Sequence, residues 1–137
     1  MDRRDLQALS KIRVKEAKAL LSAGLHDGAY YLAGYAVECA LKACIAKETR
    51  KHEFPDKKRV DDSHTHSLKK LAELAELWDA GQDRSRADPE FARYWDIARL
   101  WSEQSRYRRH SPEEAQRLVE AVDNRSHGVI AWLILYW

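Results

Sequence analysis

Apolar side chains recur along most of the chain with the three- and four-residue spacing of α-helices. The clearest stretch starts after Asp27, a favourable N-cap residue, and runs to about Arg50. One stripe along it contains Ala29, Leu32, Ala33, Ala36, Val37, Ala40, Leu41, Cys44 and Ile45. This i, i+3, i+4, i+7 spacing predicts a helix packed in a protein core, where Gly34 would allow a neighbour to approach closely.

Four further helices are predicted from the same spacing and from helix-end signals. Gly24 ends the first and Gly81 ends the third, while Asp88-Pro89 and a capping box from Ser111 to Glu114 begin the last two. The predicted spans are about 2–23, 67–80, 89–104, and 112 to near the C-terminus. Residues 51–64 have no periodic pattern and predict a loop.

Five helices joined by short links predict an all-α fold, an antiparallel up-and-down helical bundle of four to five helices. The 137 residues fit one domain, 1–137, that is long enough to bury a core. The chain has only 5 glycines and 3 prolines, which argues against a β architecture rich in tight turns. We see no internal repeat and no boundary to a second domain.

Charge and cysteine content narrow the expected environment. The formal net charge is only +2, so any basic surface must come from local clustering. Cys39 and Cys44 would point about 140° apart on one helix, so they do not pair there, and free thiols fit a reducing cytosol. The first 25 residues lack a signal-peptide pattern, and the apolar stretch 128–137 is shorter than the roughly 20 residues that span a bilayer. We expect a cytoplasmic protein with no membrane contact.

The most concentrated candidate chemistry is the segment Arg106-Tyr107-Arg108-Arg109-His110, which we call the basic segment. Arginine binds phosphate through a planar fork, tyrosine stacks on bases, and the helix start that follows favours anions. If the segment cleaves RNA, His110 would accept the 2′-hydroxyl proton as general base, and Arg106 would stabilise charge on the phosphate. The alternative is a solvated loop whose arginines pair with Glu103, Glu113 or Glu114.

Glu38 and His66 are the polar residues outside this segment with the most functional potential. Glu38 precedes Lys42 by four residues on the core helix, an order that favours an ion pair. Because Glu38 borders the apolar stripe, it either ties helices together through an internal salt bridge or hydrogen bond, or orients Arg106. His66 either caps or packs at the start of the third helix, or lines a cleft with the basic segment.

Other polar and aromatic clusters carry weaker predictions. The loop histidines His52, His64 and His66, with Asp61 and Asp62, lack the pattern of three or four converging zinc ligands, so no metal or other cofactor is predicted. Tyr30 and Tyr31 cannot both face one core, so one is a candidate for contact with a second protomer. The run 57–59 (Lys-Lys-Arg) is either a solvated stretch or a nucleic-acid contact.

Three segments together resemble the HEPN domain family (higher eukaryotes and prokaryotes nucleotide-binding). The core helix, residues 29–43, is similar to the family pattern A-x-x-x-A-x-x-A-V-E-x-A-L-K-A. Thr65-His66-Ser67-Leu68 resembles the T-H-x-L that opens the next helix of the family, and Ser105-Arg106-Tyr107 resembles its R-Y segment. In this order and spacing, the resemblance extends over residues 6–137.

The resemblance implies a bundle of four to five helices, usually a homodimer, that binds nucleotides, cleaves RNA, or partners a small nucleotidyltransferase in a toxin–antitoxin pair. Catalytic members carry an arginine, four to six residues, and then a histidine, in a cleft between protomers. This chain departs from that spacing, since only three residues separate Arg106 from His110 and one separates Arg125 from His127.

Three functional hypotheses therefore remain at this stage. The first is a homodimeric RNA- or nucleotide-binding module that contacts its ligand through the basic segment and His66, beside a nucleotidyltransferase. The second is a metal-independent endoribonuclease with Arg106 and His110 as catalytic residues. The third is a structural dimer whose activity resides in a partner protein.

Overall fold

The computed structural model of the chain describes residues 1–51, 61–62 and 64–137. Its elements are α1 (Arg3–Ser22), α2 (His26–Lys51), α4 (Leu68–Leu74), α5 (Trp78–Ala87), α6 (Pro89–Arg99), the 3₁₀ helix η1 (Glu103–Tyr107), α7 (Pro112–Asp123) and α8 (Val129–Leu133). No strand occurs in these described ranges, so the predicted all-α class is confirmed.

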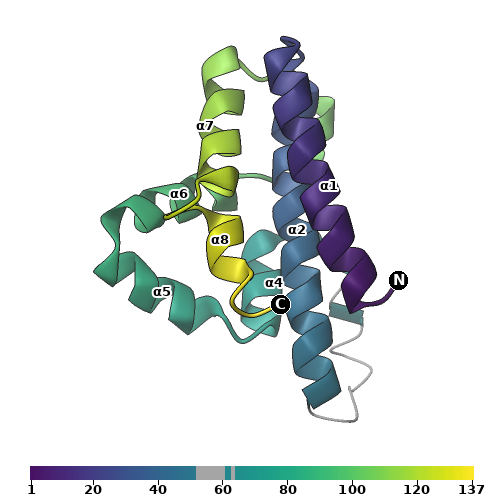
Figure 1. Cartoon of the computed structure of the whole chain (residues 1–137), viewed down its shortest axis with the longest axis vertical. Coiled ribbons are helices and arrows are strands. Elements are labelled where there is room, and N and C mark those ends of the chain that lie inside the picture. Colours follow the sequence, from purple (N-terminus) through teal and green to yellow (C-terminus); the bar gives the residue numbers. More distant parts are fainter. Residues whose placement is uncertain (52–60, 63) are drawn as a thin grey trace.

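The long helices α1 and α2 form an antiparallel pair, and α7 lies beside both of them (Figure 1). Gly24 makes the turn between α1 and α2 with a φ of +77°, a left-handed conformation that glycine adopts without strain. Helix α7 begins at the same end of the bundle as α2 (Figure 1). The segment from α4 to η1 leads back from the end of α2 to the start of α7. The bundle is therefore up-and-down, with this return formed by several short helices instead of one long helix.

Two predicted helices are each divided in the structure, and tertiary packing explains why. The predicted helix 67–80 ends as α4 at Leu74, because Glu76 adopts a φ of +60° and turns the chain. The prediction that Gly81 ends a helix is wrong. This residue lies inside α5, where a Cβ would stand 3.2 Å from the Trp132 ring.

The last predicted helix is likewise interrupted after Asp123. The side chain of Asn124 accepts hydrogen bonds from the backbone N–H groups of Ser126 and His127, which holds the turn before α8. The predicted span 89–104 also ends early, at Arg99, and the chain continues into η1. The N-terminal signals at Asp88 and Ser111 are confirmed, because each side chain caps its helix as predicted.

The core is built around α2, whose predicted apolar stripe is buried except for the partly exposed Leu32. Phe91, Trp95 and Trp132 pack against one another beside it, with ring centroids 5.1 to 6.5 Å apart. Burying an apolar side chain of this size contributes roughly 1.5–3 kcal/mol, so these rings are a main source of stability. Trp101 lies on Gly34, and this contact brings η1 against α2.

The two cysteines lie in this core as free thiols. Cys39 and Cys44 do not bridge, as predicted. Burial raises the pKa of the Cys39 thiol to about 11 and that of Cys44 to about 12, so both remain neutral near pH 7. Separately, none of the described helices has both the length and the apolarity needed to cross a membrane.

Candidate functional site

The basic segment begins in η1, and Trp101 positions this short helix against α2. A Cβ at position 34 would lie 2.2 Å from the indole of Trp101, so only glycine leaves room for the ring. Tyr31, one turn earlier on α2, contacts the same ring at a centroid distance of 6.0 Å. Arg106 interacts with the side chain of Tyr31 from the η1 side. The start of the basic segment is therefore fixed on one face of α2.

Five titratable side chains on this face form a continuous series of close contacts, which we call the acid–histidine network. Lys42 Nζ lies 3.4 Å from Glu38 Oε2, and His66 Nδ1 lies 2.9 Å from Glu38 Oε1. His66 Nε2 lies 3.2 Å from Glu103 Oε2, and Arg106 Nη1 lies 3.3 Å from Glu103 Oε1. Both ring nitrogens of His66 thus face carboxylates, and a protonated ring donates to both.

Burial differs sharply along the acid–histidine network. The side chain of Glu38 is 2% exposed, whereas that of His66 is 43% exposed. Glu103 is 26% exposed and Arg106 is 44% exposed. A buried carboxylate is stable only when it is paired, so Glu38 holds the inner nitrogen of His66 firmly. The outer end of the network is open to solvent.

These contacts resolve the predictions for Glu38 and His66. The predicted Glu38–Lys42 ion pair is confirmed. Ser67 caps α4 by accepting from the Lys70 N–H, so His66 does not cap this helix. Glu38 reaches Arg106 only through His66 and Glu103, rather than orienting it directly. The alternative prediction, that an arginine of the basic segment pairs with Glu103, is confirmed for Arg106.

His110, predicted as general base, lies in a different environment. Its side chain is 7% exposed, and its ring stacks on Tyr30 with centroids 3.8 Å apart. Its Nε2 lies 3.2 Å from the carbonyl oxygen of Ser105, and its Nδ1 lies 3.3 Å from Glu114 Oε2. Both ring nitrogens therefore face acceptors within the fold, and a substrate would reach either one only if the ring moved. The structure does not bring His110 into contact with Arg106.

His110 instead joins the starts of α2 and α7. Its backbone N–H donates to Asp27 Oδ1 at 2.6 Å. The prediction that Asp27 caps α2 is wrong, because Asp27 lies in the first turn of α2 and its side chain contacts the start of α7. Two hydrogen bonds lower the pKa of Glu114: the larger effect comes from the His110 side chain and the smaller from the Ser111 N–H. These contacts identify His110 as an anchor of the fold.

Tyr107, Arg108 and Arg109 form the exposed part of the basic segment. Tyr107 is 72% exposed, and Arg106 lies over its ring at 4.8 Å. Arg108 and Arg109 are exposed as well, and within the described ranges no carboxylate forms an ion pair with either of them. Arg109 also borders a shallow hollow of about 310 Å³ at the start of α2. This part of the segment combines free positive charge with an open aromatic face.

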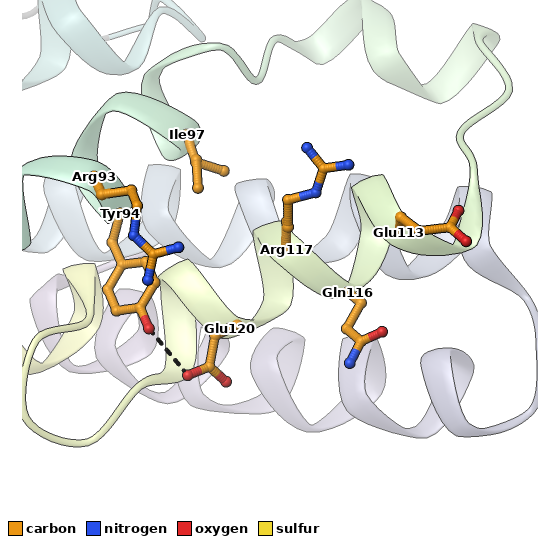
Figure 2. A pocket seen from close by; sticks show the side chains of 7 residues that line it. All are labelled: Arg93, Tyr94, Ile97, Glu113, Gln116, Arg117 and Glu120. Carbon is orange, nitrogen blue, oxygen red and sulfur yellow. Dashed lines mark hydrogen bonds between the residues drawn. The ribbon is translucent and has the colours of Figure 1, made fainter. Parts of the chain in front are cut away.

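A second hollow, of about 410 Å³, lies between α6 and α7, and sequence analysis missed it (Figure 2). Its lining consists of Arg93, Tyr94, Ile97, Glu113, Gln116, Arg117 and Glu120. The Tyr94 hydroxyl donates to Glu120 at 3.2 Å. The helical spacing of these residues indicates that they share one face of α6 and one face of α7. Only the packing of the two helices brings those faces together to form the hollow. Because guanidinium and carboxylate groups alternate here, the hollow shows no preference for anions.

The remaining candidates are distributed as follows. Lys57, Lys58, Arg59 and His52 lie outside the described residues. Among those described, no three His, Cys, Asp or Glu side chains are grouped closely enough to hold a metal ion. Tyr30 and Tyr31 are both half-buried within their own chain, against His110 and Trp101 respectively.

Comparison with known proteins places this arrangement in a family. The family model described as HEPN domain matches residues 6–132. Searches of curated proteins and of solved structures gave no significant match. The family match runs from the first turn of α1 through most of α8, and it includes Glu38, His66 and the whole basic segment. The chain therefore belongs to the HEPN domain family.

Proposed function

We propose that this HEPN domain is an RNA- or nucleotide-binding module whose principal contact is the exposed part of the basic segment. Family membership supports a nucleotide- or RNA-related role in general. The observation that carries the specific proposal is the pair Arg108 and Arg109, exposed and unpaired in the described structure, next to the exposed ring of Tyr107. Arg106 and His66 complete the proposed contact surface.

The proposed contacts follow from the chemistry of these groups. Each free guanidinium can donate two parallel hydrogen bonds to a phosphate, and such charge-assisted bonds are stronger than neutral ones. An exposed tyrosine can stack on any base, at roughly 1–3 kcal/mol per base. Since the net charge of the chain is only +2, binding should depend on this local cluster and weaken as salt rises.

Fluorescence anisotropy with a labelled single-stranded RNA of twelve nucleotides tests the proposal. Arg108→Ala combined with Arg109→Ala should weaken binding about tenfold or more, because about 1.4 kcal/mol of lost contact corresponds to a factor of ten. The logarithmic salt slope should fall by about 0.7 for each phosphate contact removed. The matched control combines Arg86→Ala with Arg125→Ala, which removes the same charge from exposed positions elsewhere. Equal losses in both double variants would contradict the proposal.

The endoribonuclease alternative, with Arg106 and His110 as catalytic pair, requires a rearrangement. His110 would have to leave Tyr30, Ser105 and Glu114 before a ring nitrogen could accept a proton. Incubating the same RNA with the protein in excess chelator tests this alternative. Cleavage that Arg106→Ala and His110→Ala abolish would support it, whereas intact RNA at high protein concentration would count against it.

We further propose that the module is a homodimer, as is common for HEPN domains. Leu100 is 82% exposed close to the basic segment, and a second protomer would cover such a side chain. Light scattering should give twice the chain mass, and Leu100→Lys should reduce it. A nucleotidyltransferase partner, as in toxin–antitoxin pairs, stays a prediction that co-purification can test.

A further inference from the structure

The carboxylate of Glu103 contacts an imidazole and a guanidinium group that come from different parts of the chain. One oxygen lies 3.2 Å from His66 Nε2, and the other lies 3.3 Å from Arg106 Nη1. A phosphate group presents two oxygens to paired donors in the same manner. Glu103 therefore occupies the position that a phosphate bound between His66 and Arg106 would take.

The two ends of the acid–histidine network differ in how firmly they are held. Glu38 is buried between His66 and Lys42, and its Oε1 would lose its partner in a buried position if His66 moved away. Trp101, seated on Gly34, fixes the approach to η1. Glu103, in contrast, begins a short 3₁₀ helix whose N-cap residue, Ser102, makes no capping hydrogen bond. The bond between His66 and Glu103 is therefore the easier one to exchange.

We propose that His66 and Arg106 form a phosphate subsite, and that Glu103 acts as an internal competitor that an incoming RNA or nucleotide phosphate displaces. This inference rests on the proposed RNA- or nucleotide-binding function and deepens it. Glu38 is a positioning residue, which keeps the outer nitrogen of His66 directed toward η1. Tyr107, beside Arg106, is placed to stack on the base attached to that phosphate.

Charge explains why displacement is needed and what its removal would do. A phosphate cannot share the space between His66 and Arg106 with Glu103, because like charges in contact repel. The free protein must break two ion pairs before it binds there. Replacing Glu103 by a neutral residue of the same shape removes this cost and leaves the His66 imidazole and the Arg106 guanidinium available.

The test compares Glu103→Gln with Glu113→Gln, which removes an exposed carboxylate near the start of α7. With the same twelve-nucleotide RNA, Glu103→Gln should bind three- to tenfold more tightly than the unaltered protein, and Glu113→Gln less than twofold. Adding His66→Gln to Glu103→Gln should abolish the gain, since the two residues act on one phosphate. Unchanged or weaker binding by Glu103→Gln would overturn the inference, as would a gain that persists without His66.

A second measurement does not depend on RNA binding. Inorganic phosphate should shift the ring NMR signals of His66 in Glu103→Gln at lower concentration than in the unaltered protein. If phosphate shifts the His66 signals in this way, but RNA affinity is unchanged by Arg108→Ala with Arg109→Ala, the proposed function fails and the subsite stands. If RNA binding needs those arginines but neither RNA nor phosphate responds to Glu103→Gln, the subsite alone fails.

Discussion

Two histidines flank the basic segment in space, and their surroundings differ in almost every respect. His110 belongs to the segment itself, yet its side chain is 7% exposed and fixed by Tyr30, Ser105 and Glu114. His66 comes from a distant part of the chain, its side chain is 43% exposed, and it is the central member of the acid–histidine network. The first connects helices, while the second faces a position that solvent and anions can reach.

This difference shows that proximity to Arg106 in sequence is a poor guide to chemical availability. A histidine whose ring is buried and stacked, with both nitrogens against acceptors of its own fold, contributes mainly to stability. A histidine held on one side by a buried carboxylate keeps its other nitrogen directed outward, where a ligand can replace the second partner. The histidine that follows Arg106 at the shortened spacing, His110, is of the first kind.

The largest expected effect concerns Gly34, which supports the His66 side of the comparison. Gly34→Ala would place a Cβ 2.2 Å from the Trp101 ring, so the ring and η1 must shift. We expect the free energy of unfolding to fall by about 2 kcal/mol, in the range of overpacked cores, and RNA affinity to fall with it. Urea denaturation followed by tryptophan fluorescence measures the first effect, and anisotropy measures the second.

Gly28→Ala is the matched control, because Gly28 lies near the His110 side of the same helix. A Cβ there would meet only Leu20 Cδ1, at 3.1 Å, which is the end of a flexible side chain. The stability change should remain within about 1 kcal/mol, and the helix preference of alanine can make it favourable. Equal destabilisation by the two substitutions would show that Trp101 does not depend on Gly34 for its position.

The second prediction is that replacing His110 mainly lowers the stability of the fold, whereas replacing His66 mainly weakens RNA binding. His110→Ala removes the stacking on Tyr30, worth about 0.5–1.5 kcal/mol, and a ring N–H hydrogen bond of about 1 kcal/mol. It should lower the free energy of unfolding by about 2 kcal/mol while RNA affinity, measured well below the melting temperature, changes less than threefold. His66→Gln should reverse this order and weaken RNA binding about tenfold.

Circular dichroism at the temperature of the binding assay confirms that both histidine variants are folded. The comparison between the two sites would break down if His110→Ala lost more affinity than His66→Gln. In that case the His110 ring would have to leave Tyr30 when ligand binds. The basic segment would then contain a histidine that participates in binding after all.

Local interactions explain which features could be predicted from sequence. The caps at Asp88 and Ser111 and the Glu38–Lys42 pair involve residues three or four positions apart, so their geometry follows from the helix itself. The basic segment was recognisable from its composition alone. The family pattern also pointed to residues 29–43 and to His66.

Contacts between distant segments explain what was missed. Glu38 and His66 are 28 positions apart, and their pairing depends on how α4 follows α2 across the end of the bundle. The position of Gly81 inside α5 depends on Trp132, which comes from near the C-terminus. The role of His110 depends on Tyr30 and Asp27, which α2 brings to the start of α7. Helical spacing along one segment contains none of these relations.

The smallest expected effect is a pH dependence confined to the His110 side. The hydrogen bond from His110 and the Ser111 N–H hold the pKa of Glu114 below its usual value of 4.5. A carboxyl group whose pKa is lower in the folded state stabilises the fold above its unfolded pKa, and this contribution is lost as the pH falls through the folded pKa. Between pH 6 and pH 3, the free energy of unfolding should therefore fall less steeply in Glu114→Gln than in the unaltered protein. Glu113→Gln, altered at the neighbouring exposed position, should follow the unaltered protein, and equal slopes in all three proteins would remove Glu114 from the anchor of His110.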